Sequence, residues 1–162
     1  MGERRDERRK TGIVQKRSFQ NAIQTMKNIV LDTNCLLASL SRNKEEYVIW
    51  KSLQNGKFNL CVTNEILDEY TEVLQRNISP TIAENVMFLL LNLDNVVFID
   101  TYFQFNLITS DPDDNKFVDC AIAANAKFIV TNDKHFKELD FIDFPKVEYI
   151  TIGEFVQELK RK

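Results

Sequence analysis

The sequence predicts an α/β fold with three layers, in which helices cover both faces of a mainly parallel sheet of about five strands. Two observations lead to this prediction. Short apolar runs without polar alternation recur along the chain, and such runs are typical of strands buried on both faces. Amphipathic segments with helix-capping residues separate these runs, and strands that alternate with helices form parallel sheets. The length of 162 residues fits one domain.

In the first half of the chain, capping residues mark the helix ends. Asn55-Gly56 is typical of a helix C-terminus, Thr63 can cap the helix that follows the second strand, and Pro80 begins another helix. The elements expected here are a strand at residues 29–31, a helical stretch at 33–40, a helix near 44–54, a strand at 58–62, a helix with an apolar stripe from 66 to 74, and a helix at 80–92.

In the second half, single strands alternate with single helices. A loop that contains Pro112 leads into one of these helices, and Asp111, Asp113 and Asp114 suit turn and capping positions in it. The elements expected here are a strand at residues 96–99, a helix from about 114 to 125, a strand at 128–130, a helix at 134–139, a strand at 147–150 and a closing helix at 153–159.

The beginning of the chain differs from the rest in charge. Residues 1–27 hold eight Lys and Arg and three Asp and Glu, a net charge of +5, whereas the remainder has a net charge of −8. We expect residues 1–26 to be a basic N-terminal extension. It is a disordered tail, an arm that binds nucleic acid or a partner, or sequence that precedes a native start at Met26. The folded domain is then residues 27–162.

Composition excludes several classes of protein. The longest apolar run has six residues, at 86–91, whereas a membrane-spanning helix needs about 20. The three cysteines are widely spaced within apolar stretches, which is unlike the close pairs of zinc sites or the dense cysteines of disulfide scaffolds. We therefore expect a soluble protein without a membrane partner, located in the reducing cytoplasm.

Carboxylates gather where parallel sheets bind ligands, beyond the carboxyl ends of the strands. Acids at such an edge repel one another unless a cation lies among them. Oxygen ligands without a cluster of His or Cys select Mg²⁺ or Mn²⁺, and these ions assist the hydrolysis of phosphodiesters. Six acids are candidates for this edge: Asp32, Glu65, Glu69, Asp114, Asp119 and Asp133.

Ordinary structural roles are also open to these residues. Asp32 and Asp133 can cap helices, and Glu69 can belong to the solvated face of its helix. Asp119 is harder to explain in this way, because it interrupts an apolar helix and a buried carboxylate needs a partner. His135, the only histidine, is expected at the surface or beside the site rather than as a general base.

Four segments form a pattern that is specific in its order and spacing: residues 29–34 (IVLDTN), 63–70 (TNEILDEY), 111–121 (DPDDNKFVDCA) and 126–133 (AKFIVTND). With them, residues 28–157 resemble the PIN-domain family, metal-dependent ribonucleases that include the VapC-type toxins of bacterial toxin–antitoxin pairs. The DPDD segment is similar to the branch of toxin components. The resemblance implies an RNA substrate, a small antitoxin partner, and a homodimer or hetero-oligomer.

The resemblance also implies roles for the acids. Asp32 and Asp133 match the first and last metal-binding acids, and Glu69, with Glu65 as the competing assignment, matches the acid that orients or deprotonates the attacking water. For the third acid we favour Asp114, which lies 19 residues before Asp133. Asp119, only 14 residues before Asp133, contributes to the metal or supports the ligands. Cleavage would leave 5′-phosphate and 3′-hydroxyl ends.

Polar neighbours and lysines complete the expected site. Thr33 and Asn34 match residues that hold the first acid in place, and Thr131 or Asn132 is expected to bind water or phosphate beside the last acid. Four lysines near the late motifs contact backbone phosphates or only solubilise their helices: Lys116, Lys127, Lys134 and Lys137.

Two other functions stay open at this point. The first is a PIN domain that binds RNA or a protein without cutting, although every expected acid is present. The second is a haloacid-dehalogenase-like phosphatase, because Asp32 ends a strand as its nucleophile would. That family needs a second acid two residues later, where this chain has Asn34.

Overall fold

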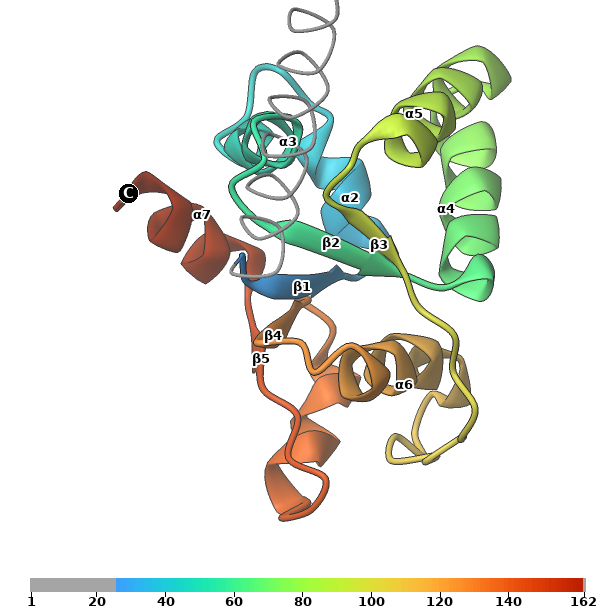
Figure 1. The fold of residues 1–162 in the computed structure, drawn as a ribbon, viewed down its shortest axis with the longest axis vertical. Coiled ribbons are helices and arrows are strands. Elements are labelled where there is room, and N and C mark those ends of the chain that lie inside the picture. Colours follow the sequence, from blue (N-terminus) through green and yellow to red (C-terminus); the bar gives the residue numbers. More distant parts are fainter. Residues whose placement is uncertain (1–25, 162) are drawn as a thin grey trace, which may run out of the picture.

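A computed structural model describes residues 26–161 and shows one sheet of five parallel strands in the order β3-β2-β1-β4-β5 (Figure 1). The predicted fold class is therefore confirmed. The N-terminal extension predicted for residues 1–26 lies, except for Met26, outside the described residues. The strands are β1 (Asn28–Leu31), β2 (Asn59–Val62), β3 (Val96–Phe98), β4 (Phe128–Val130) and β5 (Tyr149–Ile150).

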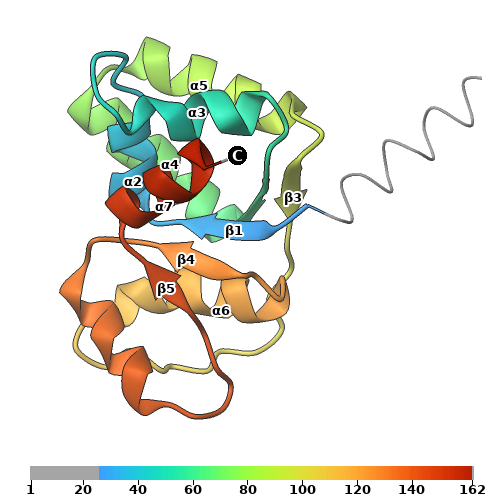
Figure 2. The same ribbon diagram turned by 90° about the vertical axis from the view of Figure 1, so that its left-hand side faces the viewer.

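Helices cover both faces of the sheet, as Figures 1 and 2 show. α2 to α5 and α7 lie on one side, where α7 packs against α3, and α6 lies on the other side against β1 and β4. None of the helices within residues 26–161 is long and apolar enough to cross a membrane. The α-helices are α2 (Thr33–Ser39), α3 (Tyr47–Gln54), α4 (Asn64–Asn77), α5 (Pro80–Asn92), α6 (Asn115–Ala123) and α7 (Ile152–Lys160).

Two short segments differ from the prediction because they are 3₁₀-helices: η1 (Pro112–Asp114) and η2 (Lys134–Phe141). η1 is a tight turn in which the Asp111 side chain accepts a hydrogen bond from the Asp113 backbone. The predicted cap at Thr63 is present, since its hydroxyl accepts a hydrogen bond from the backbone N–H of Ile66 at 3.2 Å. The three cysteines are buried and unpaired, as expected, and burial raises the pKa of each thiol to about 12.

The order of the strands decides where a site can form. Within the sheet, β2 and β3 lie on one side of β1, whereas β4 and β5 lie on its other side. In sheets of this kind ligands bind at the carboxyl ends of the strands where the order reverses. Leu31 pairs with Val130, so that Asp32 and Thr131, the next residue of each strand, lie side by side there.

Candidate active site

Asp32 lies at the end of β1 and is held by a hydroxyl from the end of β4. It is only 7% exposed, and its Oδ2 accepts a hydrogen bond of 2.7 Å from Thr131 Oγ1. Its side chain does not cap α2, which it precedes. Burial raises its pKa, the Thr131 bond lowers it, and the charges of Asp133 and Glu69 raise it again. The capping role is thus excluded, and the carboxylate faces other acids.

Glu69, on α4, has partners of its own. Its Oε1 accepts a hydrogen bond of 2.5 Å from Thr33 Oγ1, and its Oε2 accepts one from Lys116 Nζ. The Lys116 ammonium is also 3.0 Å from Asp113 Oδ1, and the side chain is only 7% exposed. Burial lowers the pKa of Lys116, but the bonds to Glu69 and Asp113 outweigh it and raise that pKa. Lys116 is therefore enclosed by acids, whereas the sequence left open a phosphate contact or a solubilising charge.

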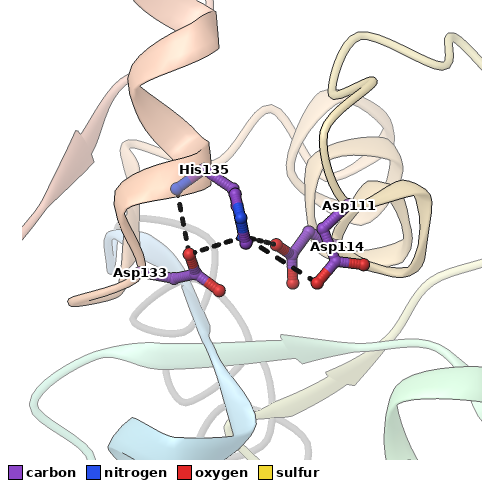
Figure 3. Close-up of side chains that lie close together, drawn as sticks. All are labelled: Asp111, Asp114, Asp133 and His135. Atoms are coloured by element: carbon purple, nitrogen blue, oxygen red, sulfur yellow. Dashed lines mark hydrogen bonds and ion pairs between the residues drawn. The ribbon is translucent and has the colours of Figure 1, made fainter.

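A second group of acids affects Asp32 through the charge of Asp133, and it includes His135 (Figure 3). Atoms of four side chains lie within 4.8 Å of one another: Asp111, Asp114, Asp133 and His135. His135 Nδ1 is 2.9 Å from Asp133 Oδ1, 3.5 Å from Asp114 Oδ2 and 3.8 Å from Asp111 Oδ2. We call this group the Asp114 cluster. It brings the loop before η1 together with the start of η2.

Two atoms of the Asp114 cluster lack hydrogen-bond partners among residues 26–161. They are Asp114 Oδ2 and His135 Nδ1, and both are buried. Asp114 is 8% exposed, and burial, followed by the charges of Asp133, Asp111 and Asp32, raises its pKa to about 7. Buried polar atoms normally have partners. Carboxylate oxygens and an imidazole nitrogen at this spacing fit a divalent cation, which would satisfy both orphaned atoms.

Asp119 and Glu65 lie together and apart from the Asp114 cluster. Asp119 accepts a hydrogen bond of 3.1 Å from the Phe105 backbone N–H, and burial and the Glu65 charge raise its pKa. The predicted metal role of Asp119 has no support in this arrangement, because its carboxylate anchors the 100–110 loop instead. Glu69 rather than Glu65 lies close enough to Asp32 to affect its pKa.

The polar neighbours differ from their predicted roles in detail. The Thr33 backbone hydrogen-bonds Asp32, but its hydroxyl is used by Glu69. The Thr131 hydroxyl holds Asp32 and also accepts a hydrogen bond of 3.0 Å from the backbone of Asp133. Asn132 Oδ1 accepts one of 3.1 Å from the Ile152 backbone. A cleft of about 320 Å³ opens beside these residues, with Asp32, Asn34, Asn132 and Asp133 among its lining residues. Three of the lysines, Lys127, Lys134 and Lys137, are exposed.

Sequence reasoning missed two members of the Asp114 cluster. It treated Asp111 as a turn residue and expected His135 at the surface or beside the site. A weak signal was present, since Asp111 lies three residues before Asp114 and His135 lies two residues after Asp133. That signal becomes specific only when the 111–114 and 133–135 segments are brought together, as they are here.

Comparisons with known proteins agree with this fold. The VapBC2 complex of Rickettsia felis, solved with a DNA fragment from its promoter, matches with a TM-score of 0.55 and 18% identity over 76% of this chain and 98% of the matched chain. A DNA-bound VapBC complex from Salmonella typhimurium matches with a TM-score of 0.50 and 15% identity over 78% and 99%. At these identities the likeness concerns the fold alone. The search of curated proteins finds no match.

The match to a family is more specific. The family model described as "PIN domain" matches residues 28–135, which include both acidic groups of the site. This result sets aside the haloacid-dehalogenase-like alternative. The residues from β1 to the start of η2 thus have both the sequence pattern and the architecture of one family, and the chain belongs to the PIN-domain family.

Proposed function

We propose that this protein is an endoribonuclease that uses Mg²⁺ or Mn²⁺ to hydrolyse RNA phosphodiester bonds. The main support is the Asp114 cluster at the switch point of a parallel sheet, in which a buried carboxylate oxygen has no hydrogen-bond partner among residues 26–161. The location is the one expected for a ligand site, and the uncompensated negative charge calls for a cation.

Asp32, Asp114 and Asp133 would hold the ion. A bound divalent ion supplies an activated water and stabilises negative charge on the phosphate oxygens. Thr131 keeps the Asp32 carboxylate in one orientation through its 2.7 Å hydrogen bond. These residues would hold the ion at the cleft that Asp32 and Asp133 line, where an RNA phosphate would bind.

Glu69 is proposed to orient the attacking water. Thr33 and Lys116 each bind one of its oxygens, and each oxygen keeps a lone pair that can accept a hydrogen bond from water. Lys116 balances the charge of Glu69 and, together with Thr33, fixes the position of its carboxylate. The exposed ammonium of Lys134 follows Asp133 directly and is placed to contact the RNA backbone.

We further propose that the protein is the toxin of a toxin–antitoxin pair and acts in the cytoplasm. Two of its structural neighbours are VapBC complexes bound to DNA, and they share this fold. The expected partner is a small antitoxin protein. Co-expression with the product of an adjacent small gene, followed by co-purification and loss of RNA cleavage, tests this part of the proposal.

Cleavage of mixed tRNA, rRNA and mRNA tests the nuclease. Wild-type protein is compared with Asp32→Asn and with Asp143→Asn, which changes an exposed carboxylate outside the site. We expect cleavage with Mn²⁺ or Mg²⁺, none with EDTA, and a loss of about 100-fold or more in Asp32→Asn only. Equal cleavage by wild type and Asp32→Asn would reveal a contaminating nuclease. Folded wild type that binds Mn²⁺ but cuts no RNA would instead indicate a narrow target or a bound inhibitor. Folded protein that neither cuts RNA nor binds Mn²⁺ would favour the non-cutting binding module.

A further inference from the structure

We infer that His135 and Asp111 are direct metal ligands in this chain, and that the site therefore prefers a divalent transition ion such as Mn²⁺ to Mg²⁺. The inference rests on the proposed function for the position of the ion. It goes further in assigning a nitrogen ligand and a metal preference, and it can be tested without RNA.

The spacing of the Asp114 cluster fits the shell of one ion. Octahedral coordination with bonds of about 2.1 Å places neighbouring ligand atoms about 3.0 Å apart and opposite ones about 4.2 Å apart. The distances from His135 Nδ1 to the three carboxylates are 2.9, 3.5 and 3.8 Å, and all four ligand atoms lie within 4.8 Å of one another. A contraction of about 0.6 Å at the widest spacing would let one ion bind all four atoms.

The imidazole is held with Nδ1 directed into the cluster. The His135 backbone N–H donates a hydrogen bond of 2.9 Å to Asp133 Oδ1, which fixes the residue at the start of η2 (Figure 3). Nδ1 itself is buried and, among residues 26–161, has no partner with hydrogen-bond geometry, although the same Oδ1 is 2.9 Å away. The orphaned Asp114 Oδ2 faces it at 3.5 Å.

A proton on the imidazole is a poorer explanation than a metal ion. One imidazolium carries a single positive charge, whereas Asp111, Asp114 and Asp133 together carry three negative charges when ionised. Asp111 uses its Oδ1 for the Asp113 backbone, which leaves Oδ2 directed at His135. A doubly charged ion balances more of this charge and satisfies the imidazole and the carboxylates at once.

The mixed donor set decides the metal preference. Mg²⁺ is bound by oxygen ligands and keeps several waters, whereas imidazole is a ligand typical of transition ions. A set of carboxylates with one imidazole therefore favours Mn²⁺ over Mg²⁺. A site of carboxylates alone would not discriminate in this way.

The chain offers a direct test because His135 is its only histidine. Mn²⁺ is added to metal-free protein without an affinity tag, and pulsed electron paramagnetic resonance is recorded. We expect nitrogen modulation from a coordinated imidazole in wild type and none in His135→Gln. Titrations should show that His135→Gln weakens Mn²⁺ binding about tenfold but weakens Mg²⁺ binding, measured by competition, less than about threefold. Asp111→Asn should weaken both ions and retain the nitrogen signal.

The controls separate this inference from the nuclease proposal. Asp143→Asn should bind both ions as wild type does, and circular dichroism checks that each variant is folded. Bound Mn²⁺ without nitrogen modulation, equal losses of both ions in His135→Gln, or no Mn²⁺ binding at all would overturn the inference. Cleavage of RNA by the same preparation would leave the nuclease proposal standing in the first two cases. A nitrogen signal without RNA cleavage would support His135 as a metal ligand but would give no support to the nuclease proposal.

Discussion

The two acidic halves of the site differ in how the protein compensates their charge. On the Glu69 side, the carboxylate is matched by the buried ammonium of Lys116 and by the hydroxyl of Thr33. In the Asp114 cluster, three carboxylates surround one imidazole, and two buried atoms lack hydrogen bonds within the described part of the chain. The two halves are adjacent, since Asp32 is affected by acids from both.

This difference agrees with the division of labour proposed for the two halves. A carboxylate that orients water must keep its position whether or not metal is bound, and an internal cation achieves this. Carboxylates that bind metal must stay available, so their charge is left uncompensated until the ion arrives. Removing the ammonium of Lys116 should therefore lower the stability of the metal-free protein. Neutralising a carboxylate of the Asp114 cluster should raise it.

The largest expected effect is that of Lys116→Met. Removing one partner of a buried ion pair leaves an unpaired charge, so we expect the free energy of unfolding to fall by about 3 kcal/mol in EDTA. Urea denaturation measures this change. The matched control is Arg76→Met, which breaks the exposed 3.8 Å pair with Glu72 on α4 and should cost less than about 0.5 kcal/mol. Equal effects of the two variants would contradict the proposed division.

The stability of the metal-free wild type should depend on pH. The pKa of Asp114 is raised from 3.8 to about 7, and that of Asp32 is also raised. The folded state thus holds protons that the unfolded state has released, and this stabilisation is lost as the pH rises through about 7. We expect a loss of about 2 kcal/mol between pH 5 and pH 8 in EDTA. Urea titrations across this range measure it, and saturating Mn²⁺ should remove the loss. Stability that rises over this range would refute the prediction.

Asp114→Asn should stabilise the metal-free protein at pH 8. The substitution removes one of the like charges at a buried position, so a gain of about 1 kcal/mol is expected at pH 8 and almost none at pH 5. The same variant should bind Mn²⁺ far more weakly, because it loses a ligand. Thermal denaturation with and without Mn²⁺ reports both effects. A destabilised variant at pH 8 would show that the cluster is already compensated.

The smallest effect on metal binding is expected for Asp119→Asn. Its carboxylate lies with Glu65 and the Phe105 backbone rather than in the Asp114 cluster, and the amide oxygen of Asn can still accept the Phe105 hydrogen bond. We expect the Mn²⁺ affinity, measured by calorimetry, to change less than twofold. A loss as large as that of Asp114→Asn would return Asp119 to the set of ligands.

Much of the fold and the position of the site followed from the sequence. Strands buried on both faces of a parallel sheet need continuous apolar runs, and these runs marked all five strands. Asp32 and the 131–133 segment were expected at the carboxyl ends of β1 and β4 for the same reason. The four motifs also identified the family, because unrelated chains rarely share their order and spacing.

Only the tertiary structure decided which charged and polar groups are in contact with one another. Lys116 and Glu69 are 47 residues apart, and Thr131 and Asp32 are 99 residues apart. Their contacts depend on β1 lying next to β4 and on α6 meeting α4. A local pattern shows that a residue is polar, but not whether its partner is water, an ammonium or another carboxylate. For this reason the sequence predicted an acidic metal site without its exact members. In the fold, acids enclose Lys116, Asp119 lies outside the Asp114 cluster, and His135 lies within it.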